Sequence, residues 1–311
     1  MPSIQAELAQ VAEYGREAAG GDPEALRALI RRLGVRRALV AEAAARAIRK
    51  AAGASWPAGL YRDVLQALLA ALSRRGVTAD PGCRVRAEAV AALAALWPPA
   101  EVVEGPLREA AATIQMENVG GAMEDVAVGL RSAAAQAMAQ LGCDCLPELG
   151  LLLCEGLPDA AGRDPLRSAR LAAALAIGRL GDPAGAALLA VRLREPAEDG
   201  EVLAACIDGL LGLQHPRAAA WIRPLLQSRD GTACVAAASA LGALAPEAAV
   251  APVVARIASA PEWLAEALTV ALGGIRGDAA AEALRRLAAD RRPKVAAAAR
   301  AALPEEPSGS G

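Results

Sequence analysis

The stretch DPGCRVRAEAVAALAAL, residues 80–96, predicts a helix that carries its own start signal. Asp80 is suited to cap the first amide groups, and Pro81 presets the backbone of the first turn. The apolar residues then recur at the spacing of one helical face. They are Val85, Ala89, Leu93 and Leu96. The stretch is therefore either one helix or one copy of a unit that the chain repeats.

The same pattern returns elsewhere, which favours a repeat. Further copies begin at Val40, Leu130, Ala169, Val202, Ala233, Leu264 and Val295. The steps between successive starts are longest at the N-terminal end and shorten along the chain, and the last three steps are equal. Regular steps of this length are typical of stacked helical units.

A second helix precedes many copies, and its start is marked by an N-cap residue. Such starts stand at Asp22, Asp182, His215 and Asp278. Each unit is then helix A, a turn and helix B. We predict an all-α, right-handed superhelical α-solenoid of about eight helical hairpins with no strand. Residues 1–21 would form an N-terminal helix or cap, residues 22–303 the solenoid, and residues 304–311 a flexible tail.

Composition agrees with closely packed helices. Of 311 residues, 55% are hydrophobic but only 2% aromatic, and phenylalanine is absent, whereas strands favour aromatic and β-branched residues. The 33 basic and 35 acidic residues give a net charge of −2, which lacks the basic excess of a dedicated nucleic-acid binder. No signal peptide or membrane-spanning stretch is evident, so we expect a cytoplasmic protein.

The repeats resemble HEAT repeats, especially the short alanine-rich type of phycobilisome lyase subunits, from about Asp22 to Leu303. HEAT repeats place an Asp before helix B and an Arg six residues later, and the two side chains form a ladder between units. Three pairs here match that spacing. They are Asp80 and Arg86, Asp125 and Arg131, and Asp164 and Arg170. Later repeats depart from it, and Asp290 would face Ala296, so we expect the ladder to stop after the fourth unit.

The longer early steps come from extra residues between helix A and helix B. These segments are residues 74–83, 116–125 and 157–166. They would lie along one edge of the N-terminal half, where loops on a rigid scaffold are plausible contact sites. Neutral variation in loop length is the alternative.

Catalytic or metal-binding motifs are not apparent. The single histidine, His215, stands before a proline at a helix start, which is a flanking position. Cys143, Cys145 and Cys154 lack the usual spacing of a zinc site, so the thiols are interpreted as structural. We therefore predict no cofactor and no metal, and a protein that is not an enzyme.

The resemblance places helix B of each unit on the concave face, which suggests a groove for a helix or extended peptide of another protein. The candidate groove residues that point away from the core are Glu88, Gln136, Arg179, Asp208, Ser239 and Glu266. Trp263 would stand at the rim as an aromatic anchor. Membrane, nucleic-acid and small-molecule partners are not expected.

Three functions stay open at this point. The first is a bacterial scaffold or adaptor for protein–protein interaction, bound through the concave groove or the long-loop edge. The second, from the resemblance alone, is a bilin lyase-like accessory subunit for chromophore attachment. The third is a HEAT-type DNA-repair glycosylase, against which the near-neutral charge counts.

Overall fold

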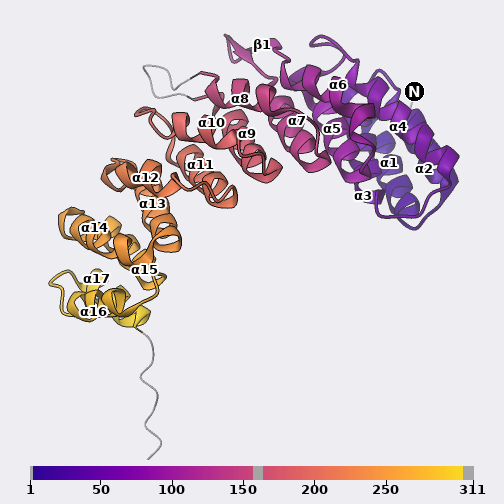
Figure 1. Cartoon of the computed structure of the whole chain (residues 1–311). Coiled ribbons are helices and arrows are strands. Elements are labelled where there is room, and N and C mark those ends of the chain that lie inside the picture. The colour runs from indigo at the N-terminus through magenta and orange to yellow at the C-terminus, as the bar shows by residue number, and fades with distance from the viewer. Residues whose placement is uncertain (1–2, 157–163, 304–311) are drawn as a thin grey trace, which may run out of the picture. The chain divides into compact units, whose positions relative to one another are not determined.

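The computed structural model describes residues 3–156 and 164–303, and the chain forms two compact units, Met1–Leu180 (unit 1) and Gly181–Gly311 (unit 2). Both units are built from stacked pairs of antiparallel helices (Figure 1). All eight predicted copies of helix B are α-helices, so the prediction of a helical repeat fold is confirmed. The tail at 304–311 and most of the segment at 157–166 lie outside the described residues.

Unit 1 consists of a row of B helices, each in contact with the next, covered by A helices. The B row is α1 (Ile4–Ala19), α3 (Ala38–Ala51), α5 (Arg84–Leu96), α7 (Val128–Leu141) and α9 (Arg167–Leu180). The A row is α2 (Pro23–Leu33), α4 (Ala58–Leu72), α6 (Ala100–Ala111) and α8 (Leu146–Cys154). A short 3-10 turn, η1 (Pro81–Cys83), leads into α5.

Unit 2 repeats the arrangement with shorter connections. Its B row is α11 (Gly200–Gly212), α13 (Gly231–Leu244), α15 (Glu262–Gly273) and α17 (Pro293–Ala302). Its A helices are α10 (Gly185–Arg192), α12 (Ala218–Ile222) with the 3-10 helix η2 (Arg223–Gln227), α14 (Pro246–Ser259) and α16 (Asp278–Leu287). Adjacent B helices contact one another here as well.

Of the four expected helix starts, only Asp22 holds the N-cap position, since the N-caps of α10 and α12 are Ala184 and Arg217. The Asp22 carboxylate accepts a hydrogen bond from the Glu24 backbone amide at 2.8 Å, which caps α2. Asp278 is not an N-cap, because α16 begins at Asp278 itself and Gly277 holds the capping position with a φ of 119°. Alanine, leucine and valine fill the core, and fully buried alanines on the B helices let neighbouring helices approach closely.

The prediction of a chain without strands is wrong in one place. Residues 116–125 form an antiparallel hairpin of β1 (Met116–Val119) and β2 (Ala122–Asp125), with Val119 opposite Ala122. Gly120 and Gly121 make the turn with φ values of 61° and 96°. Two residues of positive φ are what a tight hairpin turn needs, and glycine takes that conformation at low cost. The glycine pair in MENVGGAMED therefore indicates a hairpin turn.

The three Asp–Arg pairs expected of the ladder form in unit 1. Asp80 and Arg86 are both buried, and Arg86 Nε donates to Asp80 Oδ2 at 2.8 Å. Arg131 Nη1 lies 2.7 Å from Asp125 Oδ2, and Arg170 Nη1 donates to Asp164 Oδ1 at 2.9 Å. Each pair ties the turn before a B helix to the body of that helix.

Gln115 connects two of these pairs across the repeat boundary. Its side-chain Nε2 donates to the Asp80 carbonyl at 2.9 Å, and its Oε1 accepts from Arg86 Nη2. The Gln115 backbone amide donates to Asp125 Oδ1 at 3.1 Å, so the buried polar groups run on into the next repeat. A connected network of this kind fixes the position of every member.

Unit 2 retains ionic contacts in another form. Buried Arg192 of α10 pairs with buried Glu198, six residues later, in the turn before α11. Ala296 holds the position of the ladder arginine in the last repeat, and the Asp290 carboxylate pairs with Arg292 at 2.9 Å. Arg292 Nη1 also donates to the carbonyl of Ile257 at 3.0 Å, which links the last two repeats.

Candidate partner-binding surfaces

The B row of unit 2 carries a shallow hollow of about 390 Å3 on the face away from the A helices. Residues of α13 and α15, together with the C-cap of α15, line it. They are Val235, Ser239, Ala243, Ala267, Val270, Ala271 and Gly274. The sequence singled out Ser239, and the structure places it in this lining. The small side chains leave room for the backbone of a partner helix to approach closely.

Asp208 and Glu266 lie on the same face of the B row, on α11 and α15. Partial burial raises the pKa of the Asp208 carboxyl group above its ordinary value. Within the described residues, neither carboxylate makes a hydrogen bond or ion pair with another side chain. Both therefore remain available to a cation from outside the chain.

Trp263 opens α15 and stays 59% exposed, so a large aromatic face reaches solvent. Its ring also has a packing role, because Cη2 and Cζ3 occupy the space that a β-carbon on Gly231 of α13 would need. The tryptophan thus covers the start of the preceding B helix. Its expected part in partner binding stays a prediction.

The predicted groove residues of unit 1 differ in their environment. Glu88 is not free, because its carboxylate pairs with Arg46 at 2.9 Å and with Arg49 at 3.4 Å, both on α3. The hydrogen bond that Arg46 donates to Glu88 raises the pKa of the Arg46 guanidinium. Gln136 and Arg179 are exposed on α7 and α9.

Sequence reasoning missed two exposed apolar residues on the B row, Leu175 and Val270, which are 45% and 61% exposed. The spacing of the repeats could have predicted that these residues are exposed. Asp208, Ser239 and Val270 are separated by the same step as the starts of the last repeats, so the three occupy one register position. Any residue in that register had to face the same side as Ser239.

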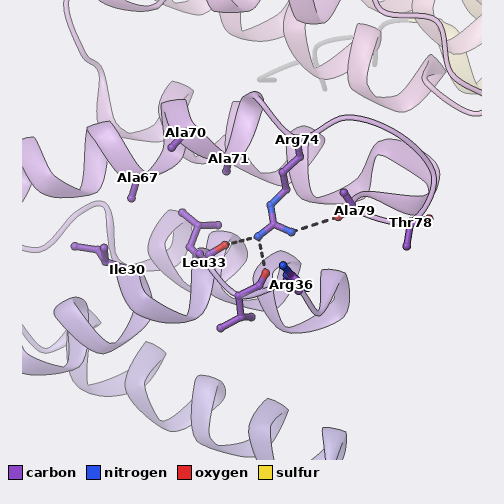
Figure 2. A pocket seen from close by; sticks show the side chains of 11 residues that line it. Ile30, Leu33, Arg36, Ala67, Ala70, Ala71, Arg74, Thr78 and Ala79 are labelled. Atoms are coloured by element: carbon purple, nitrogen blue, oxygen red, sulfur yellow. Dashed lines mark hydrogen bonds between the residues drawn. The ribbon is translucent and has the colours of Figure 1, made fainter.

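The long-loop edge of unit 1 contains a larger hollow of about 690 Å3 between α2 and α4 (Figure 2). Arg74 crosses it, and Arg74 Nη2 donates to the carbonyls of Leu33 at 2.8 Å and Val35 at 2.6 Å. Arg74 Nη1 donates to the Ala79 carbonyl at 3.3 Å. These bonds fasten the predicted loop at 74–83 to the end of α2, and they occupy the guanidinium.

A second hollow on this edge lies between α6 and α8, beside the segment that leads into β1. The exposed residues Ile114 and Leu151 border it. Met116 and Met123 of the hairpin are also exposed, at 46% and 61%. This edge therefore presents several large apolar side chains to solvent, a feature common at interaction sites.

The residues considered for chemistry are placed as follows. The His215 ring stacks on Trp221 with centroids 4.4 Å apart, and its Nδ1 accepts from the Arg217 backbone amide before α12. Cys143 and Cys145 are buried, while Cys154 is exposed at the end of α8. Among the described residues, no group of three His, Cys, Asp or Glu side chains is placed to hold a metal ion.

No protein-family model matches the chain, and no curated protein matches its sequence. Among solved structures, it is similar to the CpcE–CpcF complex of phycocyanin lyase from Nostoc sp. PCC7120, with 22% identity over 85% of this chain and 92% of that one and a TM-score of 0.49. Human deoxyhypusine hydroxylase is 17% identical over 90% and 95%, with a TM-score of 0.34. The designed armadillo repeat protein YIII(Dq)4CqI is 16% identical over 89% and 98%, with a TM-score of 0.33.

The helix pairs and the Asp–Arg pairs define a helical repeat fold that resembles HEAT repeats. The expectation that the chain is not an enzyme rested on the lack of a recognisable catalytic motif, and the similar structures contradict it. Two of the similar structures are a lyase and a hydroxylase by name. In the part of the chain that is described, no helix combines the length and hydrophobicity needed to cross a bilayer.

Proposed function

We propose that the chain binds a helical segment of another protein on the B row of unit 2. The hollow lined by α13 and α15 is the observation that carries this proposal. Its lining is mostly alanine and valine, and Val270 within it is 61% exposed. An amphipathic helix that lays its apolar stripe into such a groove would cover these side chains.

The acidic residues on this face indicate the charge of the partner segment. Asp208 of α11 and Glu266 of α15 lie on the same B row and are without an ionic partner among the described side chains, so a segment with Lys or Arg beside its apolar stripe would complement them. Charges at a rim mainly govern the rate of association and its salt dependence. Trp263 supplies an exposed aromatic surface that would contribute more to affinity.

The test begins with capture of partners from the native host by the full chain. In parallel, Val270→Asp places a charge in the hollow, and Val191→Asp places one on α10, where Val191 is 64% exposed. A partner that is retained by Val191→Asp and lost by Val270→Asp supports the groove. Equal capture by both variants would show that the partner uses another surface.

Once a partner is identified, its kinetics separate the two kinds of contact. Asp208→Lys combined with Glu266→Lys should slow association, more strongly at low salt, because both changes reverse a rim charge. Trp263→Ala should weaken binding by about 1–3 kcal/mol, which is the usual scale for an aromatic anchor. Unchanged affinity in all three changes would argue against the groove.

A further inference from the structure

The hollow at the α6–α8 edge of unit 1 has apolar walls that are open to solvent. Its volume is about 390 Å3. Of the apolar residues that line it, Ala111 and Leu152 are buried, whereas Ile114 and Leu151 are 67% and 74% exposed. Two such exposed side chains facing one hollow would gain free energy if an apolar group covered them.

The polar groups around this hollow are incompletely satisfied. Arg131 lines it and is 1% exposed, and although its Nη1 donates to the Thr113 carbonyl at 3.0 Å, its Nε and Nη2 make no hydrogen bond. Glu148 and Glu155 each have one carboxylate oxygen that is shielded from solvent and accepts no hydrogen bond. Arg131 Nε already lies 3.6 Å from Glu155 Oε2. Buried polar atoms without partners are rare in native proteins, so the two carboxylate oxygens mark a place where a donor from a ligand would pair.

The balance of charge favours a cation. Arg131 lies 2.7 Å from Asp125 and 3.6 Å from Glu155, while Arg108 lies 2.7 Å from Glu104 and 3.3 Å from Glu148. The charged residues that line the hollow are Arg131, Glu148 and Glu155, so its lining carries one carboxylate more than guanidinium groups. A carboxylate ligand would add to that excess, whereas a Lys or Arg side chain would offset it.

We infer that this hollow is a docking site for a segment of a partner protein that inserts an apolar side chain between Ile114 and Leu151 and places a Lys or Arg against Glu148 and Glu155. The site is separate from the groove on the B row of unit 2, and it uses different residues. Its apolar part would provide affinity and its acidic part selectivity for a basic partner.

Cys154 offers a direct report on occupancy, because it is exposed and lines the hollow. The other five cysteines are buried. Burial also raises the pKa of Cys83 to about 11 and that of Cys145 to about 12, which keeps those thiols protonated and slow to react. Alkylation of the full chain by N-ethylmaleimide, mapped by mass spectrometry, should therefore modify Cys154 first.

The probes are two short peptides of equal length, one alternating Leu and Lys and the other alternating Leu and Glu. The Leu–Lys peptide should slow alkylation of Cys154 about fivefold or more and should bind about tenfold more tightly than the Leu–Glu peptide, as measured by fluorescence anisotropy. Leu151→Asp should remove the protection, and Val191→Asp on α10 should keep it. Glu148→Gln combined with Glu155→Gln should bring the two affinities to within about twofold.

Several results would overturn the inference. They are protection by the Leu–Glu peptide, equal protection in wild type and Leu151→Asp, or binding of the Leu–Lys peptide that leaves Cys154 fully reactive. Circular dichroism checks that each variant is folded. Val270→Asp is measured in the same series, and its protection should match wild type, so a failure of the groove and a failure of this site give different results.

Discussion

The two units join their B helices by different means. Between α5 and α7, unit 1 places the buried pair of Asp80 and Arg86 against Gln115, so polar groups bridge the repeat boundary. Between α13 and α15, unit 2 places apolar side chains over helix positions that lack a β-carbon, as Ile275 does over Gly242. The boundary between α5 and α7 is thus held by directional bonds, and the boundary between α13 and α15 by close steric fit.

The difference explains why the repeats differ in length. A buried Arg must be matched by acceptors from the loops, and in unit 1 the acceptors at Asp80, Gln115 and Asp125 all come from the extra residues or their borders. Close packing over glycine needs no such loops, and the steps between repeats become short and equal in unit 2. The face of the B row changes as well, from ion pairs around Glu88 to a shallow hollow around Ser239.

The largest expected effect on stability is that of Arg86→Ala. Asp80 is fully buried, so the variant leaves a carboxylate without its partner in the core. Removal of one member of a buried pair costs about 3–5 kcal/mol. Chemical denaturation monitored by circular dichroism should show a loss of that size in the free energy of unfolding.

Arg84→Ala is the matched control, because Arg84 is two residues away and its side chain is 59% exposed, although it pairs with Glu42. Glu42 keeps its pair with Arg46 at 2.8 Å in this variant, so the loss should be about 1 kcal/mol or less. If Arg86→Ala is no more damaging than Arg84→Ala, the buried network does not hold unit 1 together.

The steric junctions of unit 2 are tested by Gly242→Ala. A β-carbon at Gly242 would lie 2.6 Å from Cγ1 of Ile275, and such overpacking costs about 1–3 kcal/mol. Gly129→Ala on α7 is the control, since a β-carbon there meets nothing within 4 Å. Both changes gain about 1 kcal/mol of helix propensity, so the difference between them measures the packing.

Gly129→Ala should raise the free energy of unfolding, and Gly242→Ala should fall below it by about 1–3 kcal/mol. Equal behaviour of the two variants would show that the fit between α13 and the end of α15 is loose. It would then leave the short, constant step between the repeats of unit 2 without a packing explanation.

The sequence predicted the features that depend on local chemistry. The helix pairs follow from apolar spacing and from caps such as Asp22, and the three Asp–Arg pairs follow from a separation of six residues. Contacts between residues far apart in the sequence were not predicted. Gln115 follows α6 and bonds to Arg86 of α5, and Glu88 bonds to Arg46 of the preceding repeat. No local sequence pattern predicts either contact.

The surfaces were predictable only in part, for the same reason. Register placed Ser239 and Asp208 on one face, but the hollow at the α6–α8 edge depends on how a loop, two A helices and Arg131 meet in space. Leu151 lies within the apolar run LGLLLC and is exposed. Only the packing of α8 shows which leucine faces solvent.

A smaller effect concerns pH in unit 2. The hydrogen bonds and charge of Arg292 lower the pKa of Asp290 from its ordinary value of 3.8 to about 2. The folded state is therefore stabilised by this ionised group above about pH 4, and that stabilisation is lost as the pH falls toward 2. Asp290→Asn should be less stable than wild type near neutral pH, and thermal melts should show the gap closing below about pH 4. A gap that is constant with pH would mean that the pair does not contribute through its charge.

The smallest effects compare one acidic residue from each unit, Glu88 on α5 and Asp208 on α11, and they should have opposite signs. Glu88→Gln removes ion pairs with Arg46 and Arg49, so it should destabilise unit 1 by about 1 kcal/mol or less. For Asp208, burial raises the pKa, which means that folding disfavours the charged form at neutral pH and that this penalty disappears as the group is protonated. Asp208→Asn should therefore raise the melting temperature slightly near neutral pH and lose that advantage in acid. A fall in melting temperature on Asp208→Asn would show that the carboxylate has a stabilising partner, and Asp208 would then be unavailable to the basic segment proposed for the groove.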